Sequence, residues 1–264
     1  MLFNSYVFIF LFLPTTLLGF YLIGGSGYPR IAIVWLVTAS LLFYGWWNVY
    51  YLRLILTSIV FNYAIGVSLS SRPNRGVLVF GVACNLGLIG YFKYANFFVD
   101  NLNALLGNSF VLETILLPLA ISFFTFQQIA YLVDAYRGET KEHDFLNYAL
   151  FVTFFPQLIA GPIVHHKEML PQFARRLHYQ LKASHLAIGI TIFVIGLFKK
   201  VVLADGIAIH ATPVFEAAEA GVNLTLFEAW GGALAYTLQL YFDFSGYSDM
   251  AIGLARMFGI RQPL

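Results

Sequence analysis

The sequence predicts an all-α fold, a polytopic bundle of transmembrane helices, because of its composition and the lengths of its apolar segments. Hydrophobic residues make up 59% of the 264 residues, charged residues only 11%, and the mean hydropathy is +0.76. A soluble domain contains roughly 45–50% apolar and about 25% charged residues. Aromatic residues make up 18% of the chain, and their amphipathic rings favour the headgroup level of a bilayer. A lipid bilayer is therefore the expected solvent.

The apolar segments are long enough to cross the hydrocarbon core, which takes about 20 mostly apolar residues in a helix. The first segment has no basic residue ahead of its hydrophobic run, unlike a cleavable secretion signal, so we expect it to be retained. The predicted spans are Tyr6–Ile23, Ile31–Trp47, Tyr50–Leu69, Val77–Phe98, Ile115–Val133, Leu186–Leu203 and Leu226–Phe244.

A further apolar segment, Phe145–Ile163, is interrupted by Pro156 and by the pair Gly161-Pro162. Such interruptions free backbone groups that lipid cannot satisfy. We expect a broken segment that either re-enters the membrane or lines a polar cavity, because broken helices at membrane depth lie where protein or water surrounds them, which is also where substrates bind. All of these segments are expected to form one membrane domain, residues 1–264.

Basic residues indicate the orientation of the chain, since short cytoplasmic loops collect Lys and Arg. Most of them fall on one side of the predicted bundle, which places the N-terminus outside; Lys199-Lys200 is the exception, near the outer end of its span, and this indicates a functional role. The net charge of +2 is too small to indicate a nucleic-acid partner. The residues on the predicted cytoplasmic side are Arg30, Arg72, Arg75, Arg137, Lys141, Lys167, Arg175, Arg176, Lys182, Arg256 and Arg261.

Polar groups inside apolar segments are costly in a bilayer unless they face a cavity or one another. Gln127 and Gln128 are adjacent amides inside a predicted span. Either they form interhelical hydrogen bonds, as amides often do between spans, or they line a cavity. Cys84, the only cysteine, is expected to be a small buried hydrophobe.

The segment 239–249 is the richest in polar residues. Gln239 and Asp243 are four residues apart, so they share one face of a helix. Gly246 permits a bend, and beyond it Asp249 and Arg256 share a second face, where they could form an internal ion pair. A charge pair that fixes helix packing is one interpretation of the two carboxylates, and acid–base chemistry is another.

The adjacent histidines His165 and His166 follow Gly161-Pro162. Neighbouring side chains on a helix point about 100° apart, unlike the i, i+4 pair of a helical zinc site, so no metal site is predicted. The two histidines are either interfacial residues without a further role, or they handle protons or contact an acyl donor. The sequence contains no Gly-x-Ser-x-Gly nucleophile motif and no phosphate-binding Gly-rich loop with a lysine, and no bound cofactor is predicted.

Long motifs spread over the chain resemble the membrane-bound O-acyltransferase family. The segments 3–6, 43–48 and 198–205 are similar to the branch of this family that contains the bacterial alginate O-acetyltransferase. The motifs that carry the resemblance to the family are Tyr91-Phe-Lys-Tyr-Ala-Asn96, Leu117-Pro-Leu-Ala-Ile-Ser-Phe-Phe-Thr-Phe-Gln-Gln128, Phe154-Phe-Pro-Gln-Leu-Ile-Ala-Gly-Pro-Ile163 and Tyr241-Phe-Asp-Phe-Ser-Gly-Tyr-Ser-Asp249.

The resemblance implies an enzyme of the cell membrane that moves an acyl group, usually acetyl, onto hydroxyls of an exported polysaccharide such as alginate. It implies a donor such as an acetyl thioester from the cytoplasm, and a polysaccharide or soluble acyl-relay proteins outside. In this family a histidine in a Trp-His-Gly-like segment is taken as the general base. None of the six histidines present matches it, so we expect that this histidine lies beyond Leu264 and that the chain is the N-terminal part of the enzyme.

Two alternatives remain open: a catalytically inactive fragment, and a non-enzymatic membrane scaffold or transporter. Under the acyltransferase interpretation, polar and helix-breaking residues are expected to shape the tunnel in which donor and acceptor meet. The tunnel candidates are Gln127, Gly161, Pro162, His166, Gln239, Asp243, Ser245 and Asp249.

Overall fold

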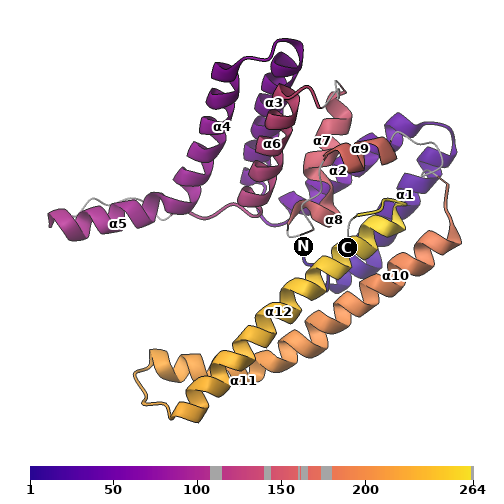
Figure 1. The fold of residues 1–264 in the computed structure, drawn as a ribbon. Helices are drawn as coiled ribbons and strands as arrows, with labels where there is room; N and C mark the ends of the chain where they lie inside the picture. The colour runs from indigo at the N-terminus through magenta and orange to yellow at the C-terminus, as the bar shows by residue number, and fades with distance from the viewer. Residues whose placement is uncertain (108–114, 140–143, 160, 162–165, 174–179, 263–264) are drawn as a thin grey trace. The chain divides into compact units, whose positions relative to one another are not determined.

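The computed structural model describes residues 1–107, 115–139, 144–159, 161, 166–173 and 180–262. Every regular element in these ranges is a helix (Figure 1), which confirms the all-α prediction. The described residues form two compact units. Residues 1–32, 161 and 180–262 make up the terminal unit, and residues 33–107, 115–139, 144–159 and 166–173 make up the central unit.

Helical stretches long and apolar enough to cross a membrane are present in both units. They are Phe8–Gly25, Tyr50–Ser71, Arg75–Leu106 and Ala183–Glu219, and they contain most of four predicted spans. The predicted span at Ile31–Trp47 corresponds to a shorter apolar helix, α2 (Pro29–Gly45).

The other two predicted spans differ from the observed helices. Residues 115–118 are not helical, Ala120 adopts a left-handed conformation (φ 59°), and helix α6 begins only at Ile121 and ends at Tyr136. The predicted start of this span at Ile115 is therefore wrong. The span predicted from Leu226 lies within α12 (Leu226–Met257), which has 32 residues and is not among the four stretches above.

Helix α12 runs through Gly246 without a break, so the predicted bend there is wrong. Its N-terminus is fixed by a capping box, in which the Thr225 hydroxyl accepts from the Glu228 N–H and the Glu228 carboxylate accepts from the Thr225 N–H. Gly246 serves close packing instead. A Cβ at this position would lie 2.7 Å from the carbonyl oxygen of Gly196 on the neighbouring helix.

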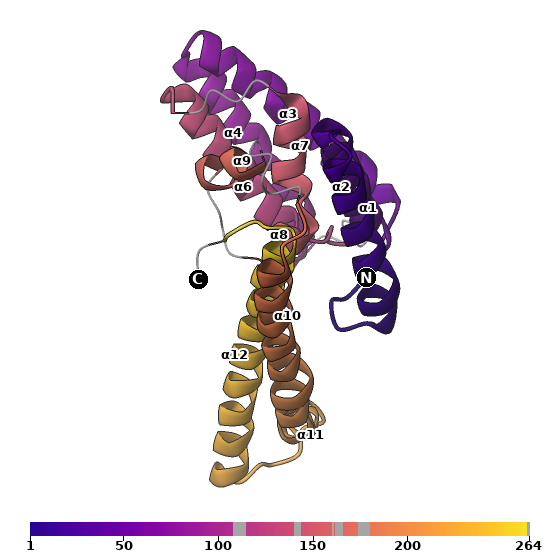
Figure 2. The ribbon, with the colours of Figure 1, turned by 90° about the vertical axis from the view of Figure 1, so that its right-hand side faces the viewer.

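The terminal unit is built on two helices that lie side by side, α10 (Ala183–Phe198) and α12 (Figures 1 and 2). Glycines at matching positions show that they are antiparallel, because Gly189 faces Gly253 and Gly196 faces Gly246. The Tyr21 hydroxyl donates to the carbonyl of Met257, which attaches the N-terminal helix to the end of α12. The remaining elements of this unit are η1 (Phe8–Phe12), α1 (Leu13–Gly25), η4 (Lys199–Ala204) and α11 (Asp205–Glu219).

The central unit contains a bundle in which α6 packs against α3 (Tyr50–Ser71) and α4 (Arg75–Ile89). Cys84 on α4 is exposed, so the prediction that it is buried is wrong; it faces outward from an apolar helix, where lipid is the expected neighbour. The other described helices of this unit are α2 from residue 33 onward, η2 (Gly90–Tyr94), α5 (Ala95–Leu106), α7 (Phe145–Thr153), α8 (Phe155–Leu158) and α9 (His166–Phe173).

The segment that begins at Phe145 is a broken helix, as predicted, throughout its described residues. Phe154 leaves the helical conformation between α7 and α8 (φ −50°, ψ 105°), and Pro156 occupies the first turn of α8. The hydroxyl of buried Ser40 on α2 accepts from the backbone N–H of Phe155 at 3.2 Å. This side chain satisfies a backbone group that the break sets free, as an apolar environment requires.

Candidate functional site

The terminal unit contains two neighbouring lysines in contact with three aspartates, which we call the lysine–aspartate cluster: Lys199, Lys200, Asp205, Asp243 and Asp249. The Lys199 ammonium donates to Asp249 Oδ2 at 2.6 Å and to Ser245 Oγ at 3.1 Å. Lys199 belongs to the π-helix η4, whereas Ser245 and Asp249 are one turn apart on α12. The contact therefore joins two helices that are distant in sequence.

The second lysine of the cluster, Lys200, bridges two carboxylates. Its ammonium lies 2.8 Å from Asp205 Oδ1 on α11 and 2.9 Å from Asp243 Oδ1 on α12. Each aspartate of α12 thus has its own lysine, and the lysines join η4 to α11 and α12. Two cations and three anions leave one excess negative charge in the cluster.

Close backbone packing sets the geometry of the Lys199 pair. A Cβ at Gly196 would lie 2.9 Å from the Asp249 Cβ, and a Cβ at Gly246 would lie 3.1 Å from the Lys199 Cβ. The two glycines each precede a charged partner by three residues, about one helical turn. Because neither glycine has a side chain, the helices approach closely enough for the ammonium and the carboxylate to meet.

The side chains of Lys199 and Asp249 are 29% and 26% exposed, so most of the surface of each side chain is covered by neighbouring protein atoms. An ion pair in a low-dielectric environment must be hydrogen-bonded as well as paired to offset the loss of hydration, and the Ser245 hydroxyl supplies one such bond. The arrangement places fixed charges on helices that are otherwise apolar. It provides a polar surface on which a polar substrate group could be oriented.

The structure brings three of the predicted tunnel candidates together, Asp243, Ser245 and Asp249. The predicted ion pair between Asp249 and Arg256 is wrong, because Asp249 pairs with Lys199 on the adjacent helix. Gln239 is half-buried one turn before Asp243 on α12.

A second polar group lies among the helices of the central unit and consists of amides and a hydroxyl, which we call the amide network: Ser58, Asn62, Asn85 and Gln128. Asn62 and Gln128 are 0% exposed. The Gln128 Oε1 atom accepts from Ser58 Oγ at 2.7 Å and from Asn62 Nδ2. Asn85 Nδ2 donates to Asn62 Oδ1 at 2.6 Å. Gln128 therefore joins α6 to α3, as the prediction of interhelical hydrogen bonds required.

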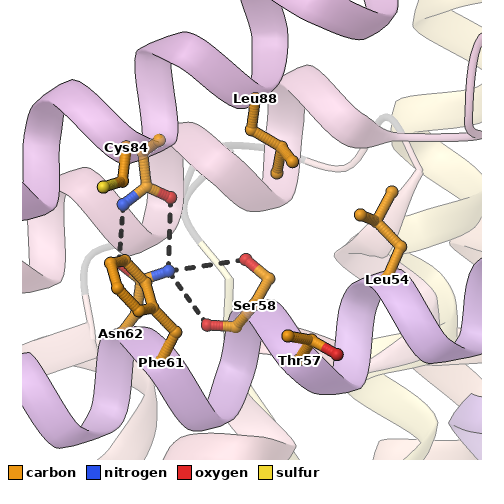
Figure 3. A pocket seen from close by; sticks show the side chains of 8 residues that line it. Leu54, Thr57, Ser58, Phe61, Asn62, Cys84 and Leu88 are labelled. Carbon is orange, nitrogen blue, oxygen red and sulfur yellow. Dashed lines mark hydrogen bonds between the residues drawn. The ribbon is translucent and has the colours of Figure 1, made fainter.

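A groove of about 220 Å³ runs beside the amide network, between α3 and α4 (Figure 3). The surface of the groove is mostly apolar, and Cys84 is one of the residues that line it. Figure 3 shows that Asn62 and Ser58 point toward one another at this groove. The residues that line it are Leu54, Thr57, Ser58, Phe61, Asn62, Cys84, Asn85 and Leu88.

The remaining tunnel candidates are placed as follows. Gln127 is 6% exposed on α6, and within the described part of the chain its Oε1 atom has no hydrogen-bond partner. Gly161 is buried, and Pro162 lies outside the described residues. His166 is the first residue of α9, but its side chain, like His165, lies outside what the structure describes.

Sequence reasoning missed Asn62 and Asn85, although each is an amide inside a predicted span. Applying to them the argument that identified Gln127 and Gln128 would have found the network. It also missed that Lys199 and Lys200 are the partners of the α12 carboxylates. The signal was present, because this lysine pair departs from the positive-inside pattern and a buried cation requires an anion.

Replacement of Asn62 with alanine is expected to destabilise the central unit by about 1–2 kcal/mol, because Asn85 Oδ1 then loses its donor in a buried position. Unfolding in mixed micelles, measured by circular dichroism, tests this expectation. Thr57→Val on the same helix is the matched control, since the Thr57 hydroxyl donates to the Arg53 carbonyl of its own helix. Equal stability of the two variants would contradict a stabilising role of the network.

The fold and the charged cluster define an integral membrane protein with a polar site among apolar helices, and comparison with known proteins identifies its family. Residues 112–262 match the model of MBOAT, the membrane-bound O-acyltransferase family. The chain belongs to this family.

Several relatives match the whole chain. It is 45% identical over 294 residues to the peptidoglycan O-acetyltransferase of Helicobacter pylori, covering 100% of this chain and 55% of that protein. It is 46% identical over 271 residues to the probable alginate O-acetylase AlgI of Pseudomonas aeruginosa, covering 99% of this chain and 50% of that protein. The teichoic acid D-alanyltransferase of Bacillus subtilis is 30% identical over 149 residues, which covers 55% of this chain and 36% of that protein. The chain thus spans about half the length of the curated relatives that match all of it.

Proposed function

We propose that this chain is part of a membrane-bound O-acetyltransferase that acts on the hydroxyl groups of an exported polysaccharide. The observation that carries the proposal is the identity of 45–46% to relatives named as O-acetylating proteins, which extends over essentially the whole chain. Both of these names refer to a polysaccharide acceptor. Alginate and peptidoglycan are therefore the acceptor classes to test first.

The reaction would form an ester bond between an acyl carbonyl carbon and an acceptor oxygen. An acetyl thioester from the cytoplasm would serve as donor: its carbon–sulfur bond breaks, and the hydroxyl proton finally resides on the released thiol. We assign the donor side to the cytoplasm and the acceptor side to the exterior of the cell membrane, where a polysaccharide or soluble acyl-relay proteins would receive the group. The N-terminus would lie outside, and residues 1–264 would form one membrane domain.

The lysine–aspartate cluster would orient the reactants. Lys199 and Lys200 are each paired with carboxylates, so their ammonium groups hold fixed positions among the helices. Their charges would position the polar part of a donor or acceptor among the apolar helices, so Asp243, Ser245 and Asp249 are proposed as positioning residues. Gln127, Gln239, Gly161, Pro162 and His166 remain candidates for the walls of the tunnel.

Acetyl transfer in cells that lack their own transferase tests the proposal. The chain is expressed from a DNA segment that includes the regions flanking its reading frame, and ester-linked acetate on the exported polysaccharide is measured after mild alkaline release. We expect acetate above the background of cells that carry the empty vector. Absence of acetate on both alginate and peptidoglycan, with the protein present in the membrane, would contradict the proposal.

A further inference from the structure

Helix α5 of the central unit has one apolar face and one polar face. Asn96, Asp100 and Asn103 lie on one side of the helix, as a helical period of about 3.6 residues requires. The opposite side carries large apolar residues, which are all exposed: Phe98 is 66%, Leu102 45%, Leu105 82% and Leu106 59% exposed. No residue of α5 is buried. Among the described elements of its unit, α5 makes extensive contact only with η2, the segment from which it continues.

Helix α5 begins at the point where the preceding helix, α4 with η2, is already long enough to have crossed the bilayer. Helix α4 has 15 residues and η2 has 5, which together rise about 30 Å at about 1.5 Å per residue, the thickness of the hydrocarbon core. Tyr94 then leaves the helical conformation (φ −121°, ψ −8°). Figure 1 shows α5 turning steeply away from the axis of α4, so α5 does not continue the span.

The residues at this turn are those that a membrane–water interface favours. Tyr91 and Tyr94 are 56% and 44% exposed, and the Lys93 ammonium lies 5.5 Å from the centre of the Tyr94 ring. Tyrosine and lysine anchor the ends of spans because each combines an apolar body with a polar tip. The turn therefore lies at the headgroup level if α4 spans the bilayer.

We propose that α5 is an interfacial helix that lies in the plane of the membrane, with Phe98, Leu102, Leu105 and Leu106 inserted into the boundary between lipid headgroups and acyl chains. Lipid covers the apolar face of α5. Two observations support lipid as the neighbour: α5 continues directly from a helix as long as the bilayer is thick, and aromatic residues lie at the turn between them. An apolar helical face of this kind sits about 5–10 Å into the boundary region. Under this assignment the span predicted at Val77–Phe98 ends at Tyr94, and Ala95 begins the interfacial helix.

Spin labels on the two faces of α5 test this proposal in lipid bilayers. Cys84 is the only cysteine, and Cys84→Ala provides the background. Single cysteines are introduced at Leu102 and Leu105 on the apolar face, and at Asp100 and Ala104 on the polar side as matched controls. Collisions of each label with oxygen, which partitions into lipid, are compared with collisions with a water-soluble nickel chelate.

The measured quantity is the ratio of a label's collision rate with oxygen to its collision rate with the nickel chelate. We expect this ratio to be several-fold higher for the labels at Leu102 and Leu105 than for the labels at Asp100 and Ala104. Equal exposure of both faces to the nickel chelate would place α5 in water and overturn the proposal. Shielding of Leu102 and Leu105 from both reagents would overturn it as well, because protein would then cover this face. Because all four positions are exposed, the labels fit without repacking; Leu106→Cys replaces either apolar variant that fails to reconstitute.

Discussion

Gly196→Val is expected to push α10 away from α12 and to destabilise the terminal unit by about 3 kcal/mol. A Cβ at Gly196 would lie 2.6 Å from the carbonyl oxygen of Gly246 and 2.7 Å from the backbone nitrogen of Met250. These are backbone atoms, which cannot move aside without displacing the whole helix. The measurement is the midpoint of unfolding in mixed micelles, and the loss should appear already, in smaller amount, with Gly196→Ala.

Gly231→Ala on α12 is the matched control, since a Cβ there meets no atom within 4 Å. Alanine favours a helix by about 1 kcal/mol over glycine, so this variant should be as stable as the parent or more stable. If Gly196→Ala and Gly231→Ala have the same effect, the close approach of α10 and α12 does not exist in the membrane.

Sequence reasoning could locate most of the long helices of this fold because apolar length predicts them, but it did not separate α5 from the preceding span. It could not locate the crossing of α10 and α12. Gly189 and Gly196 are seven residues apart, as are Gly246 and Gly253, and such spacing puts small residues on one face of each helix. However, nothing in either sequence segment specifies which helix it faces. The same limitation produced the wrong bend at Gly246, since a glycine serves a turn or a close contact equally well.

The partner of Asp249 illustrates the limit at the candidate site. The sequence interpretation paired Asp249 with Arg256 because both share one face of a single helix, but the actual partner, Lys199, is 50 residues away in the chain. Helical periodicity relates residues only within one helix, whereas the ion pair depends on the register between two. The positive-inside pattern did single out Lys199-Lys200 as unusual lysines near the outer end of a span, but it could not show which residues they contact.

The amide network was predicted in part for a related reason. Gln127 and Gln128 are adjacent and therefore conspicuous, whereas Asn62 and Asn85 are single amides in long apolar segments. Only the packing of α3 against α4 and α6 shows that Asn62, Asn85 and Gln128 meet. Of the two interpretations of Gln128, the structure supports hydrogen bonding between helices.

Lys199→Met is expected to lower both stability and acetyl transfer. Removal of the ammonium leaves the Asp249 carboxylate without its ion pair, and breaking such a pair costs about 3 kcal/mol when it is buried, and less here, where about a quarter of each side chain is exposed. If the cluster orients a reactant, loss of the ammonium lets that reactant shift, and a shift of the reactant by about 1 Å should reduce acetyl transfer by roughly 100-fold. Lys182→Met, at the exposed start of α10, is the control for loss of a lysine and should change neither quantity.

The double variant Lys199→Met/Asp249→Leu separates the structural role of the pair from its functional role. An apolar pair of similar volume is often as stable as the ion pair that it replaces, so the free energy of unfolding should return close to that of the parent protein. Acetyl transfer should stay low, because the fixed charges that orient the reactant are absent. Recovery of transfer together with stability would show that the pair only holds α12 to its neighbour, and the positioning role proposed for Asp249 and Lys199 would be wrong.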